Sequence, residues 1–286
     1  MKPVYFIITC LLLTGISFAQ PMSNIGSAGG KIKLANDQVI VIESSTDIEA
    51  SFSMGMEMVS KSIVQNSLLV KNSTDKQYTI SNTFTKIKAN LTMMGQPYSY
   101  DSENKESNNG DMAKIFDNSL NNPVDIIVDN MTGKAISEKK PVKKKDTDAS
   151  NPATDLMKMF SDNSDEGIVS GAFEVIPPGR NIGDSWSDTT GAKDMKMIRK
   201  YTLSSISGNE STILLDAVSN AVNKLDFQGM EFEIKSVTKT KGEIVTDINT
   251  GLVKKRSSIS DITGTVQMMG QDMPISAKVT SAGTYK

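Results

Sequence analysis

The side chains that most often do chemistry in proteins are nearly missing from this sequence. Its 286 residues contain no histidine and one cysteine, Cys10, which excludes Ser-His-Asp and Cys-His nucleophilic sites and the usual zinc ligand sets. Two carboxylate pairs remain, Glu231 with Glu233 and Asp162 with Asp165. Their surroundings predict a solvated strand face and a polar loop, without the buried carboxyl that acid-base catalysis needs. We therefore expect no enzyme, no catalytic residue and no cofactor.

Methionine is the enriched residue that a binding site could use. Phe52, Met54, Met56 and Met58 alternate with other residues, which predicts that they share one face of a strand. Thioethers bind Cu(I), so a copper site is one hypothesis. An adaptable apolar lining is the other, and we favour it because methionine fills irregular volumes. With no metal assigned, the predicted lining of a ligand cavity comprises Phe52, Met54, Met56, Met58, Met93, Phe227, Phe232 and Ile234.

The only tryptophan closes a segment rich in proline and glycine, residues 177–186. Asp184 can bond the backbone of a turn beside Gly183, and Trp186 then enters the core at the start of a strand. We interpret Gly183, Asp184 and Trp186 as a structural corner. Stacking of Trp186 on a ligand is the alternative.

The first 19 residues have the features of a secretory signal peptide. Lys2 precedes an apolar run over residues 5–13, and small residues at Ser17 and Ala19 indicate cleavage near Ala19. The apolar run is shorter than the ~20 residues that span a bilayer. We expect a secreted, periplasmic or cell-envelope protein that does not span the membrane. The net charge of −2 is spread along the chain and predicts no nucleic-acid partner.

Alternation of apolar and polar residues dominates the rest of the chain. It is clearest over residues 87–93, 230–234 and 273–279. Because successive side chains of a strand point to opposite faces, these segments bury one face and expose the other to water, as antiparallel sheets do. The fold is predicted to be mainly β.

The second half of the sequence repeats signals of the first. Residues 78–81 (YTIS) return as 201–204 (YTLS), and Asp129–Gly133 returns as Asp247–Gly251. Each Asp-x-x-Thr-Gly unit predicts a turn, in which the aspartate bonds the backbone and glycine adopts positive φ. We expect two related β units. The predicted division is a signal peptide at 1–19, a first unit at 20–140, a polar linker with a short helix at 141–170 and a second unit at 171–286.

Two short helices and several loops are predicted between the strands. Residues 111–120 and 154–160 place apolar side chains on one helical face, which suits packing against the concave side of a curved sheet. Residues 101–110, 138–146 and 161–167 are polar and predict loops or linkers.

The segment from Gly183 to Trp186, with Ile176-Pro177 before it and residues 201–203 and 247–251 after it, resembles a family of uncharacterised secreted bacterial proteins. That family is similar to lipoprotein carriers, the LolA-like and mycobacterial LppX-like half-barrels. The resemblance covers most of the chain after residue 19. It implies a strongly curved antiparallel sheet around helices and an apolar cavity, and a carrier role without catalytic residues.

We therefore expect curved antiparallel sheets of half-barrel type, duplicated, with a few short helices on the concave side. The predicted function is non-catalytic binding of a hydrophobic or amphiphilic molecule, such as a lipid or acyl chain. The alternative is a structural or protein-interaction module of the cell envelope, and Cu(I) binding by methionine is a minor one.

Overall fold

The computed structural model describes residues 30–52, 56–93, 95–104, 106, 108, 116–117, 119–136, 165–192, 194–227, 230–268 and 271–286. Within these residues one antiparallel sheet of eleven strands accounts for most of the chain. The prediction of a mainly β protein is confirmed. The strands are β1 Val39–Phe52, β2 Met56–Ser73, β3 Gln77–Met93, β4 Gln96–Asp101, β5 Val124–Asp129, β6 Ser185–Ala192, β7 Met195–Ser207, β8 Glu210–Phe227, β9 Met230–Asp247, β10 Val253–Met268 and β11 Gln271–Tyr285.

The sheet is two runs of hairpins joined in the middle. Its order is β4-β3-β2-β1-β11-β10-β9-β8-β7-β6, and β5 also pairs with β3. The joint between the runs is the pair β1–β11, whose register extends from Ile42 opposite Tyr285 to Phe52 opposite Ile275. The strands predicted for the two units therefore form a single sheet.

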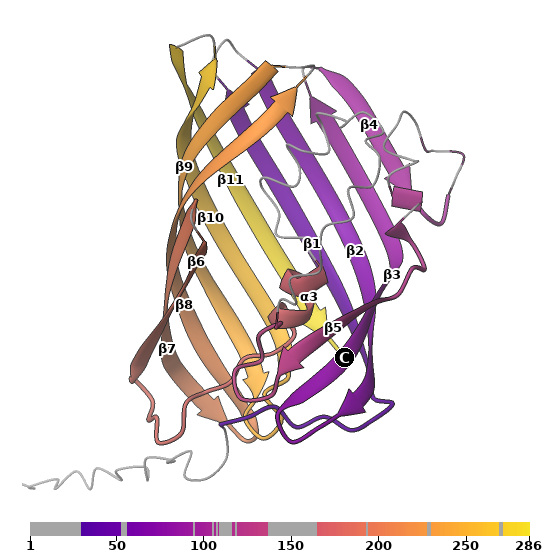
Figure 1. Cartoon of the computed structure of the whole chain (residues 1–286), viewed down its shortest axis with the longest axis vertical. Helices are drawn as coiled ribbons and strands as arrows, with labels where there is room; N and C mark the ends of the chain where they lie inside the picture. Colours follow the sequence, from indigo (N-terminus) through magenta and orange to yellow (C-terminus); the bar gives the residue numbers. More distant parts are fainter. Residues whose placement is uncertain are drawn as a thin grey trace, which may run out of the picture.

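The sheet curves into an open trough (Figure 1). It does not close into a barrel, because β6 and the β4–β5 side are its two edges. Strands β9 and β10 approach so closely at Gly264 that a Cβ there would lie 2.1 Å from the Lys235 carbonyl oxygen, so the position requires glycine. The curved half-barrel that the sequence predicted is thus the observed architecture.

A short helix, α3 (Asp165–Gly171), lies on the concave side, with β3 and β5 as its neighbours (Figure 1). It begins inside the 161–167 segment that the sequence analysis predicted as a loop. Two acidic residues, Asp165 and Glu166, occupy its first turn, where the helix dipole favours negative charge, and buried Val169 anchors it. Phe116, Asp117 and Ser119 are helical, as predicted for 111–120. The predicted helix at 154–160 lies outside the described residues.

No helix in the described ranges is long and apolar enough to cross a membrane.

The burial of strand residues follows the alternation in the sequence closely, since Ile40, Ile42, Ile48 and Ala50 of β1 are buried. Where the pattern changes phase, the pairing shows why. On β3, Ile80 and Ile87 are both buried although they are seven positions apart, an odd spacing that strict alternation would place on opposite faces. The reason is that the register shifts between Gln65 and Asn66 of β2.

The methionine-rich segment departs from its prediction. Phe52, Met56 and Met58 do not lie on one strand: β1 ends at Phe52, β2 starts at Met56, and these two residues are opposite each other. The single-strand interpretation is therefore wrong. Phe52 and Met56 pair across the hairpin and are an even number of residues apart. The same two-residue alternation therefore runs through both arms, and it does not reveal that the chain reverses between them.

The repeated Asp-x-x-Thr-Gly units form two equivalent turns at the lower end of the sheet, where β1 starts and β11 ends. Asp129 Oδ1 accepts bonds from the amides of Met131 and Thr132 at 3.0 and 2.8 Å. Asp247 Oδ1 accepts the corresponding two at 2.9 and 3.0 Å. The glycines that close these turns have φ of 71° and 72°. The predicted turns are confirmed.

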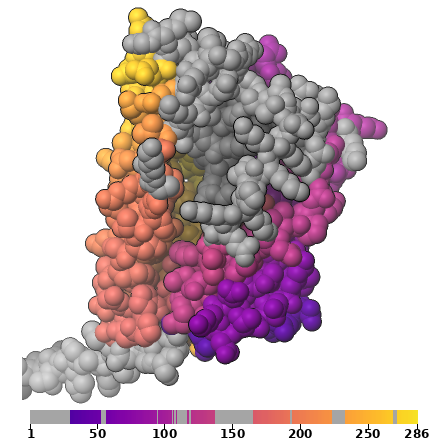
Figure 2. All heavy atoms as spheres, in the orientation of Figure 1, coloured from indigo at the N-terminus to yellow at the C-terminus, as the bar shows by residue number. Residues whose placement is uncertain are grey.

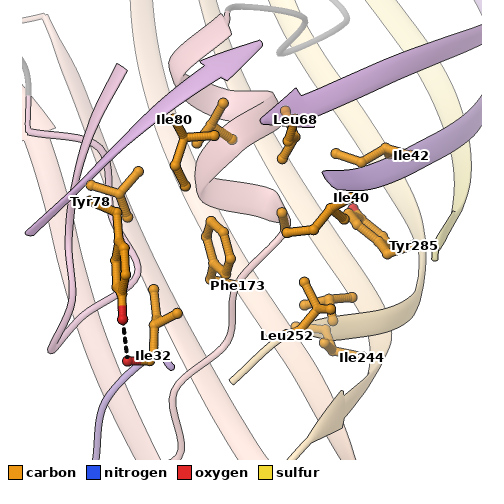
Figure 3. Close-up of a cluster of buried hydrophobic side chains, with 14 of the residues drawn as sticks. Ile32, Ile40, Ile42, Leu68, Tyr78, Ile80, Phe173, Ile244, Leu252 and Tyr285 are labelled. Atoms are coloured by element: carbon orange, nitrogen blue, oxygen red, sulfur yellow. Dashed lines mark hydrogen bonds between the residues drawn. The ribbon is translucent and has the colours of Figure 1, made fainter. Parts of the chain in front are cut away.

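A strap, residues 30–35, connects the two turns. The Ile32 amide donates to the Asn130 carbonyl at 2.7 Å, and the Lys33 amide donates to the Thr250 carbonyl at 3.0 Å. The Tyr78 hydroxyl donates to the Ile32 carbonyl at 3.2 Å, and Ile32 packs near Phe173 (Figure 3). The strap thus fastens both halves around one core.

Candidate ligand-binding face

Most of the buried apolar side chains belong to one of two clusters. The larger, here called the lower core, fills the lower end of the trough around Ile32 and Phe173 (Figure 3). The smaller, here called the upper cluster, lies toward the β1–β2 connection. It consists of Ile48, Ala50, Met58, Leu91, Ile262, Ala277 and Val279, with Phe52, Met93, Tyr98 and Phe116 partly buried against it.

The upper cluster draws its side chains from both halves of the sheet. Its members come from β1, β2, β3, β4, β10 and β11. At one side Tyr100 packs its ring 5.0 Å from that of Phe116 and donates from its hydroxyl to Asp117 Oδ1 at 2.7 Å. Burial, together with that hydrogen bond, raises the pKa of Tyr100. This side of the cluster is therefore an aromatic, poorly hydrated surface.

Three of the eight predicted lining residues belong to the upper cluster: Phe52, Met58 and Met93. Ile234 on β9 is also buried, but it lies outside that cluster. Met56, Phe227 and Phe232 belong to strands, while their side chains lie outside what the structure describes. Met54 is outside the described residues, so the copper hypothesis stays untested. Among the described residues no group of three or more His, Cys, Asp or Glu side chains is placed to hold a metal.

The Gly183-Asp184-Trp186 corner is built as predicted. The Gly183 amide donates to the Leu203 carbonyl at 2.8 Å, and Asp184 Oδ2 accepts from the Asn181 amide at 2.8 Å. Trp186 follows at the start of β6 and stacks on Tyr201 with ring centroids 5.6 Å apart. Because Trp186 packs against the lower core, its position fits the structural interpretation.

Five charged side chains form what is here called the charged group: Lys134, Glu174, Asp188, Arg199 and Arg256. Lys134 interacts electrostatically with the other four. Asp188, Arg199 and Arg256 have the strand phase of the concave face, since they share it with Tyr201 and Ile244 of the lower core. Arg256 Nη2 is 3.2 Å from Glu174 Oε2, and Arg199 Nε is 2.7 Å from Asp188 Oδ1. Burial, with Glu174 nearby, raises the pKa of Tyr201, which borders the group. The ion pairs are partly withdrawn from water, since the Glu174 side chain is only 5% exposed.

The two ends of the sheet lie near each other in space. Figure 2 shows the salmon-coloured atoms around β6 beside the magenta atoms of the first half in the lower part of the view. Two hollows, of about 320 and 460 Å³, lie over the central strands and are lined largely by the alternate, outward-facing residues, among them Glu43, Ile63, Glu49 and Val59. Neither contains an aromatic side chain.

Comparison with known proteins places the chain in a family. A family of unknown function, DUF6263, matches residues 75–253. The chain belongs to DUF6263. No curated protein matches it.

Among solved structures, this DUF6263 chain is similar to lipovitellin, described by its lipid-protein interactions. The TM-score is 0.51 at 8% identity, over 89% of this chain and 25% of the lipovitellin chain. This chain thus spans about a quarter of the length of that protein. An outer membrane channel from Pseudomonas putida F1 also aligns, with a TM-score of 0.26 and 6% identity over 89% of this chain and 97% of the channel.

The charged group of this DUF6263 member is the feature that sequence reasoning missed. A signal was present: Asp188 has the same strand phase as Trp186, and Arg199 the same phase as Tyr201, so each charge faces the side that its aromatic neighbour faces. Counting every second residue from Trp186 and from Tyr201 would have predicted that Asp188 and Arg199 lie on the concave side.

Proposed function

We propose that this protein binds a hydrophobic or amphiphilic molecule, such as a lipid or acyl chain, on the concave side of its half-barrel. It holds the ligand without changing it chemically, since the sequence beyond Cys10 has neither histidine nor cysteine. The proposal places it outside the cytoplasm, in accord with the signal peptide predicted for residues 1–19.

The upper cluster is the observation that carries this proposal. The lower core already joins the two halves and stabilises the base of the trough. The upper cluster is a second apolar group at the other end, and the flexible or aromatic side chains Phe52, Met93, Tyr98 and Phe116 are only partly buried against it. Such side chains adapt to ligands of varied shape. Each square ångström of apolar surface covered by a ligand contributes ~25 cal/mol. The fold-level similarity to lipovitellin supports the same class of ligand.

Two measurements test this function. Organic extraction of the purified protein followed by mass spectrometry is expected to release a lipid, and a fluorescent fatty acid is expected to bind the delipidated protein. The variant Met93→Gln should weaken uptake because it puts an amide into the apolar surface. Val59→Gln is the matched control, since Val59 is 42% exposed. Absence of both bound lipid and fatty-acid uptake would rule the proposal out.

A structural or interaction module is the second candidate, and one observation favours it. Met58, Leu91 and Ile48 of the upper cluster are 0%, 1% and 2% exposed, as in a filled second core. In that case Met93→Gln would lower the free energy of unfolding and leave no lipid binding to measure.

A further inference from the structure

The charged group has more positive than negative members. Lys134, Arg199 and Arg256 contribute three positive charges, while Glu174 and Asp188 contribute two negative ones. The two arginines each have one carboxylate partner, at 3.2 and 2.7 Å. Within this group one positive charge is therefore left over.

Two donors of the group lack a partner within the described part of the chain. Lys134 is half-buried and forms neither an ion pair nor a side-chain hydrogen bond there. The Nε of Arg256 is buried and has no hydrogen-bond acceptor. Buried donors without acceptors cost free energy, so they are unusual in folded proteins.

Lys134 is affected by both carboxylates and both guanidinium groups of the charged group. Burial is the main cause that lowers the pKa of Lys134; Glu174 and Asp188 raise this pKa, whereas Arg199 and Arg256 lower it. An anion bound next to the ammonium would offset both its desolvation and its repulsion by the guanidinium groups. Arginine and lysine are the residues that bind carboxylate and phosphate most strongly.

The position of the group relative to the upper cluster sets the shape of the ligand. Arg256 and Ser260 lie on the same face of β10, and Ser260 is paired with Val279 of the upper cluster. Four residues of a strand span ~13 Å. Near Val279 the hydroxyls of Thr240 and Ser260 form a hydrogen bond with each other at 2.8 Å. Each hydroxyl therefore needs fewer hydrogen bonds from water. A ligand with a charged end and an apolar tail could contact both.

We propose that Lys134, Arg199 and Arg256 anchor the carboxylate or phosphate head group of an anionic amphiphile whose tail lies on the upper cluster. This inference rests on the proposed function and specifies its ligand as negatively charged.

Binding of three lipids to the full chain tests the anchor: oleate, 1-oleoyl-lysophosphatidate and uncharged monoolein. At least one of the anionic lipids is expected to bind ~10-fold or more tightly than monoolein, because hydrogen bonds to charged groups are stronger than those between neutral groups. Their relative affinities distinguish carboxylate from phosphate. Salt should weaken the binding of the anionic lipids and leave monoolein unaffected. Inorganic phosphate alone is expected to bind far more weakly than 1-oleoyl-lysophosphatidate.

The variant Lys134→Met should reduce binding of the anionic lipids about tenfold and leave monoolein unchanged. Lys200→Met is its matched control: the same charge is lost from an exposed neighbour of Arg199 on the opposite face of β7. Should Lys134→Met fail to fold, the salt dependence of the native protein still decides.

Equal binding of all three lipids by the native protein would overturn the anchor and leave the proposed function standing. If none of the lipids bound, the proposed function would fail as well. Phosphate binding as tight as that of 1-oleoyl-lysophosphatidate would overturn the role of the tail and indicate a site for free anions.

Discussion

Gly133 and Gly251 hold the same position in two equivalent turns, but their surroundings differ. Both have φ near 70°, where a side chain is strained. A Cβ on Gly133 would lie 2.8 Å from the Cβ of Phe173, whereas one on Gly251 would have its nearest neighbour at 3.6 Å. The repeat has thus kept the backbone of the turn while the packing around it differs.

Substitution by alanine should reveal this difference. Gly251→Ala is expected to lower the free energy of unfolding by ~1–2 kcal/mol, from backbone strain alone. Gly133→Ala adds a clash in the lower core and should cost ~1–3 kcal/mol more. Urea unfolding of the two variants measures the difference. Equal losses would show that Phe173 moves aside at little cost.

Tyr201 should make the protein sensitive to alkali. Burial raises the pKa of Tyr201 in the folded protein, whereas an unfolded tyrosine has a pKa of about 10. Above pH ~10 the unfolded chain loses this proton before the folded one does, so stability present below that pH is lost as the pH rises. Urea midpoints measured from pH 8 to 11 should fall less steeply for Tyr201→Phe than for the native protein. Parallel curves would contradict the prediction, and the values at pH 8 serve as the baseline.

Among the structural elements, the short strap of residues 30–35 contacts both halves of the molecule. It contributes buried Ile32 to the lower core and donates one amide to each of the repeated turns. The strap is thus the element through which one turn is coupled to the other.

Shortening Ile32 to alanine should lower the free energy of unfolding by ~2–5 kcal/mol, the usual cost of such a cavity. Hydrogen exchange is expected to speed up at the amides of both turns, Gly133 and Gly251 included. Lys31→Ala, at an exposed neighbouring position, should change neither quantity. Faster exchange at only one turn would mean that the strap does not couple them.

Sequence patterns predicted the elements better than their junctions. Alternation identified β3 and β11, and the aspartate and glycine of each repeat identified its turn. The reversal between Phe52 and Met56 was missed because both arms of that hairpin carry the same phase. The start of α3 was missed because Asp165 and Glu166 suggested a polar loop, although acidic residues also favour a helix N-terminus.

The candidate site was predictable only in its apolar part. Phe52, Met58 and Met93 were found because an alternating pattern marks them as buried. The ion pair of Arg256 with Glu174 joins residues 82 apart in sequence. No local sequence pattern predicts such a long-range contact. Predicting it requires the strand register, which places Arg256, and the path of the chain after α3, which places Glu174.

Considered as a whole, the molecule should unfold as a single cooperative unit. The β1–β11 pairing joins the halves along most of each strand, and the lower core includes Ile80 of one half and Leu203 of the other. Trp186 reports on its surroundings at the start of β6, in the second half, whereas far-ultraviolet circular dichroism reports on the entire sheet. Their urea transitions are expected to coincide. A tryptophan transition clearly separate from the dichroism change would show that the halves unfold independently.

The central β1–β11 pair brings together strands more than two hundred residues apart in the sequence. During synthesis the amino-terminal hairpins must wait with an open edge until β11 emerges. In a crowded solution that edge can accept β11 from a neighbouring molecule, which would give a domain-swapped dimer with native pairing throughout. Refolding at high protein concentration should therefore yield such dimers, and dilute refolding should yield monomers.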